Sequence, residues 1–215
     1  MKALTGFVES EVIAGLKKHF PNPRIELNHR NRYELLIVII LSAQTADKKV
    51  NEISPLLFSR YPNVRALANA DLKDLQHILK PLGFYRRKAA IIKHCAQVLH
   101  DEYHSKIPET IEELIQLPGV GRKSASAVLV NAYNKPAIVV DTHVIRLANQ
   151  RWKLSKSRNP DKIEIDLAKF FSRDNWIFIA KALVLFGRYI CTAKKPKCKE
   201  CSLLQICPYE RKTLR

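Results

Sequence analysis

Four cysteines near the C-terminus have the most specific chemical spacing in this sequence. They follow the pattern Cys-X6-Cys-X2-Cys-X5-Cys and are Cys191, Cys198, Cys201 and Cys207. Thiolates are soft ligands that suit iron–sulfur clusters or zinc, and four within 17 residues can surround one centre if the chain folds as a compact loop. Four-cysteine zinc sites usually pair two Cys-X2-Cys units, and this sequence has one, so we favour an iron–sulfur cluster over zinc. Two disulfides or four reduced structural thiols remain as the alternative.

A second segment combines glycines with basic residues. Residues 117–123 read LPGVGRK and lie between two stretches with helical spacing of apolar residues, which predicts a helix-hairpin-helix over about residues 111–132. Gly119 and Gly121 can take backbone angles closed to other residues and let N–H groups approach an anion at the start of the second helix. Such a hairpin can bind phosphate without reading bases. A merely structural turn is the alternative.

The net charge indicates the kind of partner. The chain has 37 Lys and Arg against 20 Asp and Glu, a formal charge of +17 over 215 residues. This excess favours a polyanion as the partner. The first 20 residues include acidic side chains and no long apolar stretch, so we expect no signal peptide. The sequence contains no run of 18 apolar residues, so we predict no membrane span and expect a cytoplasmic protein.

The elements that must position these residues are mostly short helices. Helical periods dominate the chain, and prolines separate the elements. Residues 35–41 and 137–140 are β-branched runs that could be buried strands, so the pattern alone leaves a mixed α/β fold open.

The sequence resembles the endonuclease III class of the helix-hairpin-helix DNA glycosylases over nearly its whole length. The resemblance rests on LLIVIILSAQTAD, LPGVGRKSA, VDTHVIR and the cysteine loop that GRYIC begins. It implies an all-α fold of two domains, in which residues 35–41 form a buried helix. A six-helix barrel would span residues 25–135, and residues 1–24 and 136–215 would form a domain that holds a [4Fe–4S] cluster. DNA would lie in the groove between the domains.

The resemblance assigns catalysis to Lys123 and Asp141, which are 18 residues apart here as in the family. A lysine that forms a Schiff base must be neutral to attack. A place in the first turn of a helix, beside Arg122 and partly desolvated by substrate, favours loss of its proton. Asp141 can stabilise positive charge on the sugar and help take that proton, and it can also cap the helix that follows.

Two residues are expected to support nucleotide extrusion. By the resemblance, Gln44 fills the gap that the extruded nucleotide leaves. Phe84 stands where the family usually has an aliphatic wedge, and a core aromatic is the alternative. His143 would lie beside the flipped nucleotide, or else pack or cap at the start of a helix.

Phosphate contacts are expected from the hairpin, from Arg86-Arg87-Lys88 and from the lysines of the cysteine loop, for which a solvated face is the alternative. The residues expected to bind DNA are Gln44, Phe84, Gly119, Val120, Gly121, Arg122, His143, Lys194 and Lys195.

The resemblance implies a bifunctional enzyme of base-excision repair. It would remove oxidised or ring-saturated pyrimidines from double-stranded DNA and cleave 3′ to the abasic site by β-elimination, and we expect a monomer associated with the nucleoid. A mismatch glycosylase of the same fold is an alternative, but its relatives typically lack a lysine at the position of Lys123. The adenine-specific ones also have an extra C-terminal domain, and this sequence ends eight residues after Cys207. A non-catalytic, cluster-bearing DNA-binding module is the second alternative.

Overall fold

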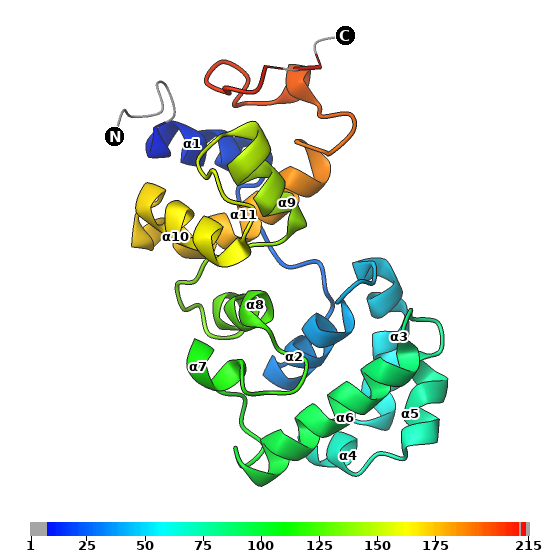
Figure 1. The fold of residues 1–215 in the computed structure, drawn as a ribbon. Coiled ribbons are helices and arrows are strands. Elements are labelled where there is room, and N and C mark those ends of the chain that lie inside the picture. Colours follow the sequence, from blue (N-terminus) through cyan, green and yellow to red (C-terminus); the bar gives the residue numbers. More distant parts are fainter. Residues whose placement is uncertain (1–7, 211, 214–215) are drawn as a thin grey trace. The chain divides into compact units, whose positions relative to one another are not determined.

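The computed structural model of this chain describes residues 8–210 and 212–213. These residues form helices and connecting segments with no strand among them, which confirms the all-α prediction (Figure 1). The chain divides into two compact units: unit 1 comprises residues 1–25 and 135–215, and unit 2 comprises residues 26–134. Residues 1–7, which begin the stretch for which we expect no signal peptide, lie outside the described part.

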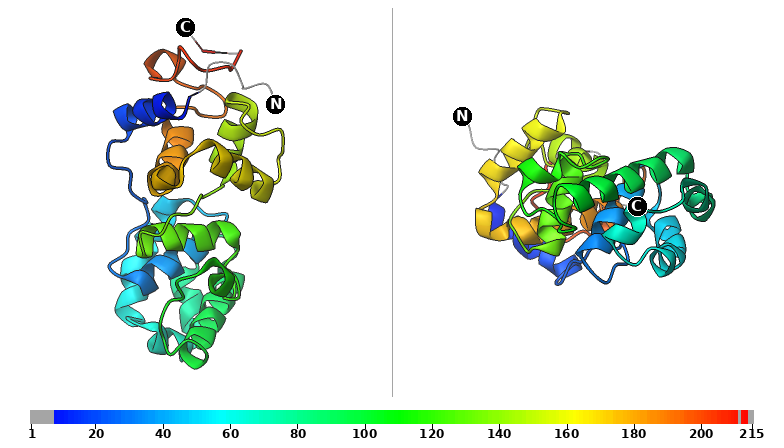
Figure 2. Two further views of the ribbon diagram at one scale, coloured as in Figure 1. Left: turned by 90° about the vertical axis from the view of Figure 1, so that its left-hand side faces the viewer. Right: turned by 90° about the horizontal axis from the view of Figure 1, so that it is seen from below.

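Unit 2 contains the helix-hairpin-helix segment. Within it, α2 packs against α3, α6 and α8, and α6 packs against α4 and α5 (Figure 2). Its helices are α2 (Arg32–Leu41), α3 (Asp47–Arg60), α4 (Val64–Ala68), α5 (Leu72–Leu79), α6 (Tyr85–Asp101), α7 (Ile111–Leu114) and α8 (Arg122–Ala132).

Helix α2 is buried on all sides. Every residue from Tyr33 to Leu41 is buried, so the helix shows no exposed face that periodicity could detect. A helix satisfies its own backbone hydrogen bonds and can therefore be surrounded by other elements. Its start is capped by Asn31, whose side chain accepts a hydrogen bond of 2.9 Å from the Glu34 N–H. The strand alternative for residues 35–41 is wrong, and the buried helix that the resemblance implies is confirmed.

Unit 1 combines the N-terminal helix with the C-terminal part of the chain. Helix α11 packs against α1 and α9, and Leu16, Trp152 and Phe186 are among the fully buried side chains of its core. Residues 137–140 are buried and not paired with any described residue as a strand. The elements of unit 1 are α1 (Glu9–His19), α9 (Thr142–Ile145), the π-helical η1 (Arg146–Arg151), α10 (Pro160–Phe170), the 3₁₀-helical η2 (Arg173–Asn175), α11 (Trp176–Tyr189) and the 3₁₀-helical η3 (Cys198–Glu200).

The cysteine loop is anchored on α1. A Cβ at Gly15 would be 2.2 Å from Leu203 Cδ2, so only glycine allows the loop to approach the helix this closely. The Ser202 hydroxyl donates to the Gly15 carbonyl at 2.7 Å, and the Ser202 N–H donates to His19 Nε2 at 3.1 Å. The two ends of the chain are thus joined in one core.

Among the helices of the described residues, none has both the length and the apolar composition that a membrane span requires.

Candidate active site and cysteine loop

Three segments that are far apart in the sequence meet at one end of unit 2. A Cβ at Gly119 would be 2.4 Å from Ile91 Cγ2 and 3.1 Å from Ile40 Cγ2. Ile40 lies in the last turn of α2, just before the loop that contains Gln44. Ile91 lies near the start of α6, which Phe84 precedes. The hairpin, the Gln44 loop and the start of α6 are therefore neighbours, and we call this part of unit 2 the hairpin end.

The two glycines of the hairpin have different roles. Gly119 has a φ of 82°, a left-handed conformation that favours glycine, and its closeness to α2 and α6 excludes a side chain. Gly121 has a φ of −90°, and a Cβ there would meet no atom within 4 Å. The expectation that Gly121 also needs special backbone angles is wrong. Its missing side chain instead leaves open space beside the first turn of α8.

Val120 holds the hairpin together from the inside. Its side chain is buried, and its N–H donates to the Leu117 carbonyl at 3.0 Å, so this amide is already used within the turn. The structure thus gives Val120 a packing role and leaves its DNA contact a prediction.

Lys123 is the second residue of α8 and is exposed. The N-cap, Gly121, has no side chain to accept a hydrogen bond, and the first turn of α8 contains no acidic residue. The first N–H groups of a helix have no partner within it, and the helix dipole makes this end positive. Arg122 next to it is exposed too. The start of α8 is therefore suited to attract an anion and to present the Lys123 amine to it.

Gln44 and Phe84 have the same unusual backbone conformation. Their φ angles are 54° and 57°, in the left-handed region that residues with large side chains seldom adopt. Gln44 is exposed, and the Phe84 side chain is 67% exposed. The alternative that Phe84 is a core aromatic is therefore wrong. Backbone strain of this kind often occurs at functional sites, because the surrounding structure must maintain it.

Lys88 corrects one sequence-based expectation. Its side chain is only 6% exposed, and its ammonium donates to the Leu41 carbonyl at 2.8 Å and to the Thr45 hydroxyl. Burial lowers the pKa of the Lys88 ammonium. The expectation that Lys88 contacts phosphate is wrong, whereas Arg86 and Arg87 are exposed and remain candidates.

Asp141 is the N-cap of α9 in unit 1, as the sequence predicts. Its Oδ1 accepts hydrogen bonds of 2.9 Å from the N–H groups of His143 and Val144. The residue is half-buried at the end of the buried segment 137–140. No described residue donates a hydrogen bond to Oδ2, so one carboxylate oxygen remains for chemistry while the other fixes the orientation of the side chain.

His143 packs within unit 1. A Cβ at Gly187 would be 2.8 Å from His143 Cβ, so this glycine allows α11 to lie against the start of α9. The Arg146 guanidinium lies 3.3 Å from His143 Nδ1. These contacts support the packing alternative for His143, and its place beside a flipped nucleotide stays a prediction.

The four cysteines line one small cavity of about 20 Å³, whose other walls are mainly apolar. All four are free thiols, so the disulfide alternative is wrong. Burial raises the pKa of the Cys191 thiol to about 11 and also raises the pKa of Cys201 and Cys207, with a smaller contribution from the neighbouring thiols. Among the described residues, no three His, Cys, Asp or Glu side chains are spaced to hold a single metal ion.

Two arginines that we assigned no role hold the backbone around Cys191. Arg146 donates to the carbonyls of Gly187 and Cys191, and Arg151 donates to the carbonyls of Thr192 and Ala193 at 3.2 and 3.1 Å. Arg151 is only 4% exposed, and its Nε has no hydrogen-bond partner among the described residues. Arg146 ends the VDTHVIR motif, which is the one sequence signal that could have identified it.

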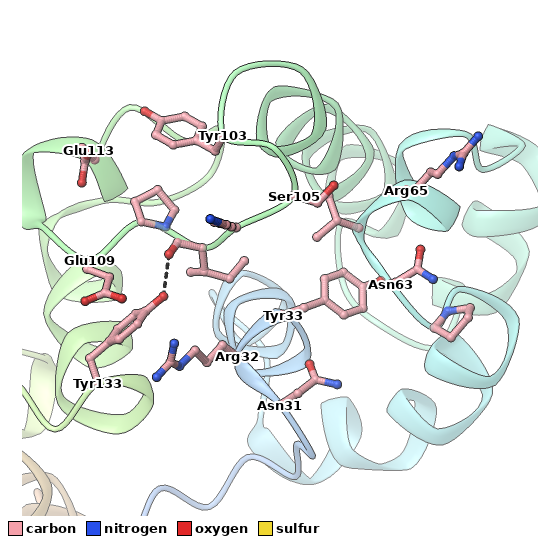
Figure 3. Close-up of a pocket in the computed structure, with 15 residues that line it drawn as sticks. Asn31, Arg32, Tyr33, Asn63, Arg65, Tyr103, Ser105, Glu109, Glu113 and Tyr133 are labelled. Carbon is pink, nitrogen blue, oxygen red and sulfur yellow. Dashed lines mark hydrogen bonds between the residues drawn. The ribbon is translucent and has the colours of Figure 1, made fainter.

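A pocket of about 1040 Å³ lies at the other end of α2 and α8, where α2 begins and α8 ends (Figure 3). The Arg32 guanidinium lies over the Tyr133 ring at 4.2 Å, and the Tyr133 hydroxyl donates to the Ile107 carbonyl. None of the residues expected to act on DNA lines it. In unit 2 those residues belong to the exposed hairpin end, and this pocket is no part of it.

Comparison with known proteins identifies a matching family and several similar proteins. Residues 37–173 match the family model described as HhH-GPD superfamily base excision DNA repair protein. The chain is similar to endonuclease III of Synechocystis sp., with 39% identity over 200 residues, which are 93% of this chain and 91% of that protein. Endonuclease III of Bacillus subtilis is 38% identical over 192 residues, 87% of this chain and 86% of that protein.

A solved structure is similar to the whole described fold. It is described as "Structure of a Trapped Endonuclease III-DNA Covalent Intermediate: Estranged-Adenine Complex" and has a TM-score of 0.87 and 35% identity to this chain. The match covers 94% of this chain and 96% of that one. The two-domain helical fold that the sequence resemblance implies is therefore confirmed.

Proposed function

Because this chain belongs to the HhH-GPD superfamily of base excision DNA repair proteins and is a DNA glycosylase, we propose that it also cleaves the abasic site that it creates. In this proposal it removes oxidised or ring-saturated pyrimidines from duplex DNA and then breaks the backbone on the 3′ side by β-elimination. The observation that carries the proposal is the exposed Lys123 amine at the uncapped start of α8.

Lys123 is the proposed nucleophile. Its Nζ attacks C1′ of the damaged nucleotide, and the bond between C1′ and the base breaks as the new carbon–nitrogen bond forms. The sugar ring then opens: the C1′–O4′ bond breaks, O4′ takes a proton and Nζ gives one up, which leaves a Schiff base between Nζ and C1′. The Schiff base acidifies the proton on C2′, and loss of that proton expels the 3′ phosphate. A similar endonuclease III has been trapped as a covalent intermediate with DNA, which supports a covalent mechanism. Lys123 is exposed in the DNA-free chain, so its amine is open to a sugar that approaches the start of α8.

Asp141 is the proposed charge-stabilising group. Positive charge grows on the sugar as the base leaves, and a fixed carboxylate stabilises it. The two hydrogen bonds to Oδ1 hold the side chain in place, and Oδ2 has no described donor, which leaves it for the sugar. Lys123 and Asp141 belong to different units of the chain.

Extrusion of the damaged nucleotide leaves a gap in the base stack that must be filled. Gln44 and Phe84 are the proposed fillers because both are exposed side chains at the hairpin end, in backbone conformations that the local structure must maintain. A His143 contact to the flipped nucleotide is a weaker proposal, since the residue is partly buried against α11.

Duplex DNA is the proposed partner, held through its phosphates. In unit 2, the exposed groups proposed to contact phosphate lie at the start of α8 and near the start of α6. They are Gly119, Gly121, Arg122, Arg86 and Arg87. In unit 1 they are Lys194 and Lys195 on the cysteine loop. The net charge of +17 supports a large electrostatic contribution to binding, which carries no sequence information.

The four cysteines are proposed to hold a [4Fe–4S] cluster. The fit rests on four free thiols around one mainly apolar cavity and on the buried Arg151 guanidinium, whose charge partly opposes the rise in the pKa of Cys191 and Cys207. A buried cation beside thiolates suits an anionic cluster. When bound, the cluster crosslinks the loop, and the chain itself presents Lys194 and Lys195 from that loop.

Borohydride trapping tests the proposed function. The protein is incubated with duplexes that contain thymine glycol, an abasic site or undamaged thymine, with and without borohydride. We expect base release from thymine glycol, strand cleavage at the abasic site, and a covalent adduct on both damaged duplexes only when borohydride is present. Base release without any adduct would instead support the mismatch glycosylase alternative, which lacks the lyase step. The non-catalytic module is not compatible with membership in a family of repair enzymes.

A further inference from the structure

Lys88 is a buried lysine that the proposed reaction does not use. It lies in the first turn of α6, four residues after Phe84, and is 6% exposed. Its ammonium donates to the Leu41 carbonyl at 2.8 Å and to the Thr45 hydroxyl. A buried charge is costly unless hydrogen bonds compensate for the lost water, so these two contacts are required for the side chain to stay where it is.

Both acceptors belong to the segment around Gln44. The Leu41 carbonyl is at the C-terminal end of α2, where the helix dipole is negative and a cation is favoured. Thr45 follows Gln44 directly. Within the loop, the backbone N–H of Ala43 donates to Ile40 at 3.3 Å and that of Thr45 donates to Ser42 at 3.1 Å. The left-handed backbone of Gln44 must be maintained by its surroundings, and the ammonium adds a contact on each side of it.

The same lysine also contacts the start of its own helix. The Lys88 N–H donates to the Phe84 carbonyl at 3.0 Å, which closes the first turn of α6 after the left-handed Phe84. The backbone of Lys88 therefore holds Phe84, and its side chain holds the loop of Gln44. No other described lysine makes this pair of contacts.

We propose that Lys88 is a positioning residue that fixes the distance between Gln44 and Phe84, so that both enter the base stack together when a nucleotide is extruded. This inference rests on the proposed function of those two residues. It assigns Lys88 no contact with DNA, because its ammonium is covered by protein. Its effect should thus be on the recognition of damage and not on electrostatic attraction.

Lys88→Met tests this role because it keeps the unbranched stem of the side chain, one atom shorter, and removes its hydrogen bonds. The variant is titrated against a duplex with a reduced abasic site and against an undamaged duplex, over a salt series. We expect the affinity ratio between the two duplexes to fall about five- to tenfold, which lies within the coupling energies of residues in contact. The salt dependence of binding should not change, because no phosphate contact is lost. A shallower salt slope in Lys88→Met would show that the lysine reaches phosphate and would overturn the proposal.

A double-mutant cycle with Gln44→Ala decides whether Lys88 acts through Gln44. If it does, Lys88→Met should have little further effect on the affinity ratio once Gln44 is alanine. If the two effects multiply independently, the proposal is wrong. Thr45→Val is the second variant in case Lys88→Met does not fold, since it keeps the bond to Leu41 and removes only the hydroxyl contact. Thr45→Val should lower the affinity ratio between the two duplexes by a smaller factor than Lys88→Met does. An unchanged ratio would contradict the proposal.

Failure of the proposed function gives a different result. A wild-type protein that neither prefers damaged duplex nor forms a borohydride adduct would refute the function itself. A wild-type protein that does both, with a Lys88→Met variant that matches it in affinity ratio, would refute only the role of Lys88.

Discussion

The hairpin end of unit 2 and the cysteine loop of unit 1 are built in opposite ways. At the hairpin end, Lys123, Gln44 and Phe84 are exposed. They stand on backbone that the buried Ile40 and Lys88 and the half-buried Ile91 support. In the cysteine loop, the four thiols are partly buried, and the buried Arg151 and the half-buried Arg146 hold the backbone. The first region separates reactive groups from structural ones, and the second combines both roles in the same residues.

This difference predicts how substitutions should act. At the hairpin end, changing an exposed group should alter activity with little change in stability. In the cysteine loop, changing a thiol should alter stability and metal content before it alters chemistry. Asp141 combines both features, because one oxygen caps a helix and the other has no described donor.

The largest expected effect is that of Lys123→Gln. Removal of the proposed nucleophile should abolish the borohydride adduct and strand cleavage, while binding to a damaged duplex persists because the hairpin stays intact. Adduct formation is measured by denaturing gel electrophoresis, and Lys73→Gln, at an exposed lysine of α5, serves as the matched control. A Lys123→Gln protein that still forms the adduct would show that another amine is the nucleophile.

Asp141→Asn should give the next largest effect. The amide oxygen can still cap α9, but the negative charge is lost, so single-turnover base release should fall about 100- to 1000-fold. The melting temperature should change little, because asparagine is about as good an N-cap as aspartate. Near-normal rates together with a lower melting temperature would mean that Asp141 is mainly structural.

Cys198→Ser tests the cysteine loop. A metal that binds during folding contributes its binding free energy to stability, so the variant should lose solubility and iron before any direct effect on catalysis appears. The wild type should be brown and contain about four iron atoms and four sulfides per chain, as a [4Fe–4S] centre requires. Metal analysis and visible absorbance provide the measurement, and Cys95→Ser, far from the loop in sequence, controls for the loss of a buried thiol. Colourless wild-type protein with one zinc per chain would refute the cluster.

The hairpin glycines offer a matched pair that separates the closely packed backbone of the hairpin end from its open surface. Gly119→Ala should lower the free energy of unfolding by about 2–4 kcal/mol, because its Cβ would overlap Ile91 and its φ is positive. Gly121→Ala should change it by less than about 1 kcal/mol, since nothing lies within 4 Å of the added carbon. Urea denaturation of the two variants measures the difference. Equal effects would contradict the close packing of Gly119.

The smallest effect is expected from Lys194→Ala combined with Lys195→Ala. Both lysines are exposed on the cysteine loop, so stability should be unchanged. Each lost phosphate contact reduces the slope of log affinity against log salt by about 0.9, which gives a change of up to about two for the pair. Damaged and undamaged duplexes should lose affinity alike. An unchanged slope in anisotropy titrations would show that these lysines form a solvated face.

Local sequence signals predicted the features that depend on neighbouring residues. The cap by Asp141 joins its carboxylate to amides two and three residues later, so the order of residues is enough to predict it. The start of α8 after a glycine pair is local for the same reason. Whether the four cysteines of the loop form disulfides was decided by the structure instead, because the spacing of cysteines does not show which bonds form.

Other features depended on contacts between distant segments, and the sequence patterns predicted them wrongly or not at all. Helix α2 shows no periodicity because it is buried on every side, so only the family resemblance predicted it as a helix. Arg-Arg-Lys at residues 86–88 looked like three equal phosphate contacts. The fold buries one of them against α2, more than 40 residues away in the chain.

The sequence by itself determined the chemical groups of this protein: four thiols in one loop, an amine at the start of a helix, a carboxylate that caps the next one, and a large positive charge. These follow from residue type and short spacing. The tertiary structure decided which of these groups are exposed to solvent and which are buried in contacts with other parts of the protein. Burial depends on residues far apart in the sequence that pack together, as Ile40 and Ile91 do around Gly119 and as Lys88 does beneath the Gln44 loop. The same residue type is therefore a proposed nucleophile at Lys123 and a structural cation at Lys88.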